Sequence, residues 1–187
     1  LVEFDDSGWK THAFAETGTA TATFRGASVS TDEIVGEPGW YLARPGFWHG
    51  ACGPAACWAG GAAGLVDFAV QQSREDSHTL AHLGAMHASI WAMRSYLDSA
   101  AHEIDSASTN ALEARIRALT IRHLIEQECT GVLRRLARAY GPYPLAMDAD
   151  IARRYQELDL YLRQSHAERD LEALGRDARH HCATTNR

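Results

Sequence analysis

The pattern of hydrophobic and polar positions divides the chain into a short alternating part and a long helical part. From Thr19 to Gly26, polar residues at odd positions alternate with apolar or small residues at even positions. This period of two is typical of a half-buried strand. Val2–Phe4 and Trp9–Phe14 have the composition of two further short strands. The pattern therefore predicts a three-stranded meander, which is too small to be stable in water without a partner.

Three residues that favour turns, Gly36, Pro38 and Gly39, follow the strand-like part, and nearly everything after them has helical periodicity. A strand-rich segment that opens a helical domain is typical of a piece of a larger protein. The predicted divisions are 1–41 for the remnant of a β-domain, 42–175 for a helical bundle and 176–187 for a flexible tail.

Four helical stretches are predicted at about 45–73, 83–104, 110–140 and 147–175, the last with a break near 165–170. Thr109 and Asn110 offer an N-cap for the third stretch. The loops are short, so neighbouring helices should be antiparallel. The predicted fold is mainly α, a four-helix up-and-down bundle with a short β-strand appendage at the N-terminus. The clearest apolar stripe, with alternating steps of three and four, is Leu83, Met86, Ile90, Met93, Leu97, Ala100 and Ile104.

The first helical stretch is unusually rich in small residues. Each glycine inside a helix costs roughly 1 kcal/mol relative to alanine. Such a run makes sense where a backbone must approach another backbone or a ligand closely. Two interpretations remain open, close helix–helix packing and a cofactor lying against the helix. The small residues concerned are Gly53, Cys57, Gly60, Gly61 and Gly64.

Composition excludes several classes of protein. The formal net charge of −6 argues against a nucleic-acid binder, which normally carries a basic face. No uninterrupted apolar segment reaches the ~18 residues that a membrane span needs. The 4 cysteines show no CxxC spacing, and reduced, buried thiols of a cytoplasmic protein are expected. We therefore expect a cytoplasmic protein without nucleic-acid or membrane partners.

The sequence contains 10 histidines, which raises the question of a metal site. His78 and His82 are i, i+4 neighbours on one helical face. They would need a third and a fourth ligand, which the pattern does not identify. No nucleophile elbow, P-loop or dinucleotide fingerprint is present either. No metal site is predicted.

The order of a strand, the segment VSTDEIVGEPGWY, a small-residue helix and three long helices resembles the second half of an acyl-CoA dehydrogenase. The resemblance covers nearly the whole chain but about half of a typical family member. It implies a helical C-terminal domain that packs on FAD in a protein that oxidises the CH–CH bond of an acyl-CoA. A chain of this extent is expected to be inactive by itself. The matching positions in the exit from the β-domain are Phe24, Val29, Val35, Gly36, Gly39 and Tyr41, with Ser30 where the family usually has proline.

The resemblance also implies two site residues. Arg74 lies where the family has an arginine that reaches the flavin pyrophosphate of a neighbouring subunit, although Glu75 and Asp76 follow it here instead of Phe-Gly. A cation suits a pyrophosphate. The family's catalytic base is a glutamate nine residues after an Arg-Asp pair. Glu172 has that spacing from Arg163 and would remove the α-proton of the thioester. An alternative register places Arg163 itself at the position of the base, which would abolish that chemistry.

Two further interpretations stay open. Residues 161–175 are also similar to flavin monooxygenases that share the dehydrogenase fold and lack the catalytic glutamate. Alternatively, the heptad-like second helix favours a non-catalytic helical oligomerisation module. Aromatic residues at high density commonly mark an interface, so a homo-oligomer is expected. The aromatic residues that gather before and within the first helix are Trp40, Phe47, Trp48 and Trp58.

Overall fold

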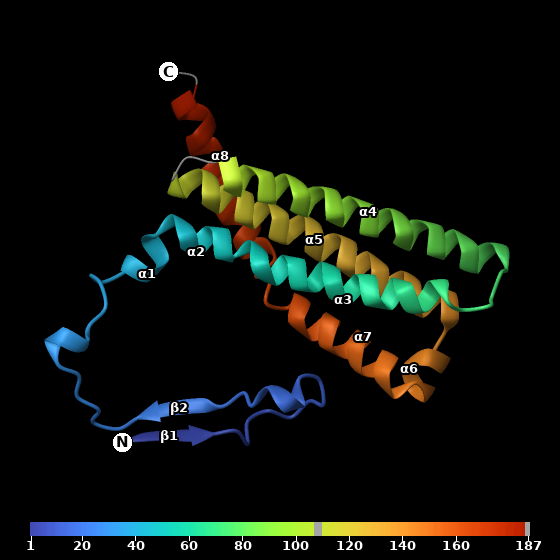
Figure 1. The fold of residues 1–187 in the computed structure, drawn as a ribbon, viewed down its shortest axis with the longest axis horizontal. Coiled ribbons are helices and arrows are strands. Elements are labelled where there is room, and N and C mark those ends of the chain that lie inside the picture. Colours follow the sequence, from blue (N-terminus) through green and yellow to red (C-terminus); the bar gives the residue numbers. More distant parts are fainter. Residues whose placement is uncertain (107–109, 186–187) are drawn as a thin grey trace.

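The computed structural model describes residues 1–106 and 110–185 and is mainly helical, with a small sheet at the N-terminus (Figure 1). Strands β1 (Val2–Asp5) and β2 (Thr21–Phe24) pair in antiparallel fashion, with Val2 opposite Phe24. All eight strand residues are exposed. The hairpin therefore has no face covered by the described part of the chain.

The predicted third strand at Trp9–Phe14 is wrong. This segment forms consecutive turns, in which the Trp9 indole N–H donates to the Ala13 carbonyl at 2.9 Å and the Ala13 N–H donates to the Thr11 hydroxyl at 3.1 Å. Phe14 has a left-handed backbone with φ of 54°. The aromatic residues that suggested a strand serve local turns and one helix contact instead.

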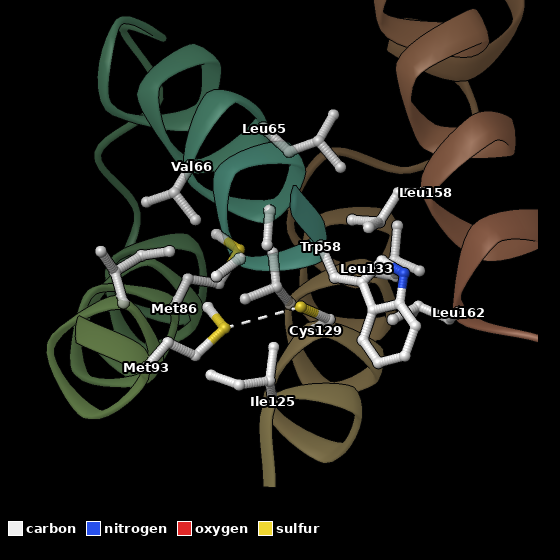
Figure 2. Close-up of a cluster of buried hydrophobic side chains, with 14 of the residues drawn as sticks. Trp58, Leu65, Val66, Met86, Met93, Ile125, Cys129, Leu133, Leu158 and Leu162 are labelled. Carbon is white, nitrogen blue, oxygen red and sulfur yellow. Dashed lines mark hydrogen bonds between the residues drawn. The ribbon is translucent and has the colours of Figure 1, made fainter. Parts of the chain in front are cut away.

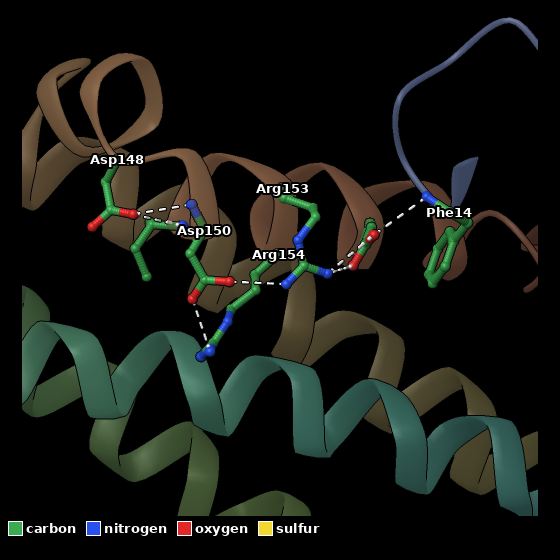
Figure 3. Close-up of polar contacts among 7 residues, drawn as sticks. Phe14, Asp148, Asp150, Arg153 and Arg154 are labelled. Carbon is green, nitrogen blue, oxygen red and sulfur yellow. Dashed lines mark hydrogen bonds and ion pairs between the residues drawn. The ribbon is translucent and has the colours of Figure 1, made fainter. Parts of the chain in front are cut away.

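The hairpin connection contacts the bundle through one polar network on α7 (Ala149–Leu162) (Figure 3). The Phe14 N–H donates to the Glu157 carboxylate at 3.3 Å, and the Phe14 ring meets Tyr161 edge to face. Arg153 bridges Glu157 at 3.2 Å and Asp150 at 2.8 Å. This network orients the strand-containing segment against the helices while leaving the strands themselves open.

Residues 26–39 lead from β2 to two short helices, α1 (Trp40–Ala43) and α2 (Pro45–Gly50). Gly36 has φ of 74°, and a Cβ at this position would lie 2.7 Å from the Trp40 ring. The turn signal at Gly36 thus reflects both a left-handed backbone and a close approach.

The bundle consists of α3 (Cys52–Val70), α4 (Ser77–Ser106), α5 (Ala111–Tyr140) and α7, and each of these helices runs antiparallel to the one before it, so that α3 and α5 point the same way (Figure 1). Of the two predicted cap residues of α5, Thr109 lies outside the described residues. Asn110 is confirmed, because its side chain accepts a hydrogen bond from the Leu112 N–H at 3.0 Å. None of the helices in the described residues combines the length and apolar character needed to cross a bilayer.

Buried side chains from these four helices form one core (Figure 2). The predicted stripe of α4 packs against α3 and α5, and the apolar side of α5 packs against α3, α4 and α7. The Cys129 thiol contacts the Met93 sulfur at 3.5 Å, and burial raises the pKa of Cys129 to about 12. Central core residues are Trp58, Leu65, Val66, Met86, Met93, Ile125, Cys129, Leu133, Leu158 and Leu162.

The mainly α fold with its N-terminal strand appendage agrees with the prediction, but the last helical stretch differs. It comprises α6 (Tyr143–Met147), α7 and α8 (Glu168–Thr185), with the expected break between α7 and α8. The predicted helix end at Gly175 is wrong, because α8 continues through it. The physical reason is a contact the sequence pattern does not reveal: Asp177, buried on α8, pairs with Arg115 of α5 at 3.1 Å.

Candidate functional site

A pocket of about 530 Å³ lies where α1 and α2 meet α5 and the connection between α7 and α8. Aromatic rings of α1 and α2 form one wall, and polar and charged groups of α5, the α7–α8 connection and α8 line another part. A pocket of this size with mainly apolar walls and a few convergent polar groups is typical of small-molecule sites. Its principal lining residues are Tyr41, Arg44, Phe47, Trp48, Leu119, Arg122, Gln164, His166 and Asp170.

The aromatic wall is held together by edge-to-face contacts and one cation. Phe47 contacts Tyr41 and Trp48, with ring centroids 5.7 Å and 5.2 Å apart. The Arg44 guanidinium lies 4.1 Å from the centre of the Tyr41 ring and 5.2 Å from that of Trp40. The Arg44 Nε is buried and has no hydrogen-bond acceptor among the described residues. This wall can pack an apolar group, and the Arg44 guanidinium places a cation beside it.

Arg122 links three segments around the pocket, and we call it the clamp for that reason. It is only 9% exposed, and it donates to the Gln164 carbonyl at 3.0 Å and more weakly to the Ala51 carbonyl at 3.4 Å. Its guanidinium also lies 4.8 Å from the centre of the Trp58 ring. Burial lowers the pKa of Arg122, an effect that the charge of Asp170 opposes. Arg122 thus joins α5, the start of α3 and the α7–α8 connection at one point.

A histidine and a carboxylate face each other on the α7–α8 connection. His166 Nδ1 lies 3.3 Å from Asp170 Oδ1, and the His166 backbone N–H donates to Asp170 Oδ2 at 3.2 Å. Ala167, which directly follows His166, has a left-handed backbone with φ of 46°. Such a conformation is costly for a residue with a Cβ and is commonly found at functional sites. A carboxylate that fixes an imidazole is a recurring arrangement for proton transfer.

Arg74 lies outside this pocket, in the α3–α4 connection. It donates from Nε to Asp76 at 2.6 Å and from Nη1 to the Ala139 carbonyl at 3.2 Å. Asp76 also accepts hydrogen bonds from the Thr79 hydroxyl and the backbone at the start of α4, and these bonds lower its pKa well below the usual range. The acidic neighbour is therefore a helix cap to which Arg74 is bound. Arg74 borders a separate hollow of about 310 Å³.

Glu172 lies on the exposed surface of α8 and pairs with Arg176, one turn further along the helix. It does not line the pocket. Arg163, the alternative occupant of the same register, pairs with Asp159 at 3.3 Å. The α3–α4 connection and α8 lie at opposite ends of the bundle (Figure 1), so this chain does not bring Arg74 and Glu172 together.

The small-residue helix α3 presents two different faces. A Cβ at Gly61 would lie 3.4 Å from Leu158 and one at Gly64 would lie 3.7 Å from Arg154, so this side packs against α7. Gly53 and Gly60 have nothing within 4 Å of that position. Close packing within the described chain therefore accounts for Gly61 and Gly64 but not for the other small residues of α3. Gly53, Gly60 and the exposed Cys57 form an open face of the helix.

The prediction that Trp58 belongs to an exposed aromatic cluster is wrong. Trp58 is fully buried in the core and meets Tyr161 edge to face. Trp40 is exposed, whereas Phe47 and Trp48 are partly buried in the pocket wall. Within the described ranges, no three histidine, cysteine or acidic side chains gather into a group that could hold a metal ion.

Comparisons of this chain with models of protein families, with curated proteins and with solved structures each found no match. Four residues of the pocket were not identified from the sequence: Arg44, Arg122, His166 and Asp170. One signal was available. The apolar stripe of α5 steps from Leu119 to Ile125 and omits position 122, where an arginine takes the place of a core residue.

Proposed function

We propose that this chain is the helical C-terminal portion of a FAD-dependent oxidoreductase similar to the acyl-CoA dehydrogenases, which oxidises the CH–CH bond of an acyl thioester. The observation that carries the proposal is the aromatic and arginine-lined pocket. It forms where the segment leading from the strands, through Tyr41 and Arg44, meets the α7–α8 connection. An apolar acyl chain suits the aromatic wall, and the Arg44 guanidinium beside Tyr41 suits a thioester carbonyl.

The open face of α3 fits a flat ring system. Space at Gly53 and Gly60 lets a planar group approach the helix backbone, and the exposed Cys57 lies between them on the same face. These residues would hold one side of a flavin ring. A bound flavin supplies an acceptor for the hydride that leaves the β-carbon of the substrate. The chain's own contribution is a surface that excludes water from that side.

Arg74 is the proposed pyrophosphate contact, as the family resemblance implies. Its guanidinium is half exposed, with 58% of the side-chain surface accessible. Two of its N–H groups are bound to Asp76 and Ala139, and a guanidinium carries five such donors. Arg74 can therefore meet a phosphate oxygen without giving up the contact that caps α4.

The hairpin supports a larger assembly around the helices. Its strands are exposed on both faces, and a two-stranded sheet by itself is at best marginally stable in water. Phe4 and Phe24 are 75% and 69% exposed, so burial against a further β-surface would stabilise the hairpin. In this proposal that surface belongs to the flavin-binding β-domain, and the chain alone does not turn over acyl-CoA.

The decisive experiment is a flavin assay on the full-length protein. Flavin absorbance at about 450 nm should accompany the purified protein and decrease when an acyl-CoA is added under anaerobic conditions. A Gly60→Trp variant should lose flavin but keep its helical circular dichroism, because the new side chain occupies the open face. The matched control Ala88→Trp adds the same bulk to an exposed position of α4. No flavin in any preparation, or equal flavin in both variants, would refute the proposal.

A second candidate function is a homo-oligomerisation module, favoured by exposed apolar residues on α4. Trp91 is 70% exposed and Leu80 is 47% exposed. Large exposed aromatics of this kind are enriched in protein interfaces. We expect sedimentation to give a dimer or larger species at micromolar concentration and Trp91→Ser to weaken it. A monomer with the native Trp91 would remove this candidate.

A further inference from the structure

The pocket contains a proton-accepting arrangement that is separate from Glu172. His166 borders the pocket, and its side chain is 52% exposed, so the ring can be reached from the pocket and from solvent. Asp170 is more shielded, with 20% of its side-chain surface exposed. The shielded carboxylate is thus the fixed partner, and the imidazole is the accessible one.

The contact geometry assigns the two ring nitrogens. His166 Nδ1 lies 3.3 Å from Asp170 Oδ1, so it is the ring nitrogen that faces the carboxylate. In the tautomer with its proton on Nδ1, the lone pair of the imidazole is on Nε2, the nitrogen that does not face Asp170. The second oxygen of Asp170 accepts the His166 backbone N–H at 3.2 Å. One carboxylate therefore fixes both the backbone and the ring of the same residue.

The surroundings hold this pair in place and suit a developing negative charge. Arg122 binds the Gln164 carbonyl two residues earlier, and Ala167 holds a left-handed backbone one residue later. The other charged groups that face the pocket are both cations, Arg44 and Arg122. A buried cation near a reacting carbonyl stabilises an enolate more than it stabilises the neutral thioester.

We infer that His166, oriented by Asp170, is the proton acceptor for the α-carbon of an acyl thioester bound in this pocket. The inference rests on the proposed function, and it assigns the role of base to a histidine on the α7–α8 connection in place of Glu172. The α C–H bond breaks, the proton moves to His166 Nε2, and the electron pair remains on the substrate as a thioester enolate. Returning the proton from the imidazolium to the α-carbon regenerates the starting thioester, so this half of the chemistry needs no oxidant.

The test measures exchange of α-protons in D2O, which does not depend on redox turnover. The full-length protein is mixed with butanoyl-CoA or octanoyl-CoA, and deuterium at the α-carbon is followed by NMR. His166→Gln should slow exchange at least ~100-fold, the contribution typical of a general base. The affinity for butanoyl-CoA, measured by calorimetry, should change less than threefold. His87→Gln, at an exposed position of α4, is the matched control and should exchange at the native rate.

Further variants separate a chemical role from a structural one. Asp170→Asn keeps an oxygen for the His166 backbone N–H but loses the charge, and it should slow exchange about tenfold. His166→Ala should be inactive in exchange and should recover on addition of free imidazole. A variant damaged only in folding would not be rescued by imidazole.

Each outcome decides one claim. Three results would overturn the assignment. The first is exchange at the native rate in His166→Gln, and the second is no exchange in the unmodified protein. The third is loss of exchange in Glu172→Gln while His166→Gln keeps full exchange activity. Flavin content and its bleaching are recorded on the same preparations. Bleaching that persists in His166→Gln leaves the proposed function intact and removes His166 as the base. A flavin-free protein that still exchanges α-protons through His166 refutes the oxidoreductase and retains the base.

Discussion

Replacing Arg122 by methionine should destabilise the protein by about 2 kcal/mol. The lost hydrogen bond to the Gln164 carbonyl, at 3.0 Å, involves a charged donor and contributes about 1.5–3 kcal/mol. The stacking over Trp58 contributes about 1 kcal/mol. The contact to the Ala51 carbonyl, at 3.4 Å, exceeds the normal hydrogen-bond range and adds little. Methionine avoids the cost of burying a guanidinium, which offsets part of the loss.

The assay is thermal unfolding of the two proteins at neutral pH, followed by circular dichroism. For a chain of this length, 2 kcal/mol corresponds to a decrease in Tm of about 4–8 °C. Arg134→Met is the matched control, because Arg134 is exposed on the same helix and its loss should stay within about 0.5 kcal/mol. Amide exchange should also accelerate selectively at residues 164–170, since Arg122 holds that connection. If the two variants are equally stable and amide protection at residues 164–170 is unchanged, Arg122 does not hold the α7–α8 connection.

Three other predictions concern stability. Leu158→Ala should cost about 3 kcal/mol, because Leu158 is 4% exposed and fills the space beside Gly61; a chemical denaturation curve with an unchanged midpoint would contradict this. Ala167→Gly should raise the free energy of unfolding by about 0.5–1 kcal/mol, since relief of the left-handed strain exceeds the entropy that glycine gains when unfolded; a lower Tm would exclude strain at this position. The lowered pKa of Asp76 means that its stabilisation is present above the ordinary carboxyl pKa near 4 and is lost as pH falls further. The Asp76→Asn variant should therefore have a lower free energy of unfolding than the unmodified chain at pH 7. This difference in free energy should become smaller below about pH 4.

The helices could be predicted from the sequence because their stability depends on local periodicity. The stripe from Leu83 to Ile104 places one apolar side along α4, and Asn110 supplies a side-chain cap to α5. Both signals act over one or two turns and do not require knowledge of distant residues. The turns at Trp9–Phe14 could not be predicted, because a short apolar run suits a strand as well as turns that are held by contacts to a distant helix. The conformation of this segment depends on contacts with Glu157 and Tyr161, which lie more than 140 residues away in sequence.

The pocket depended on tertiary structure almost entirely. Arg122 on α5 becomes a clamp only because folding places the carbonyl of Gln164 and the ring of Trp58 beside it. The same folding leaves Glu172 on the exposed side of α8 and places His166 at the border of the pocket. Sequence spacing records the distance along a helix, but it contains no information on which side of the break at 163–167 a side chain faces. That direction is set by the packing of α8 on α5, where Asp177 meets Arg115, and by the left-handed backbone at Ala167.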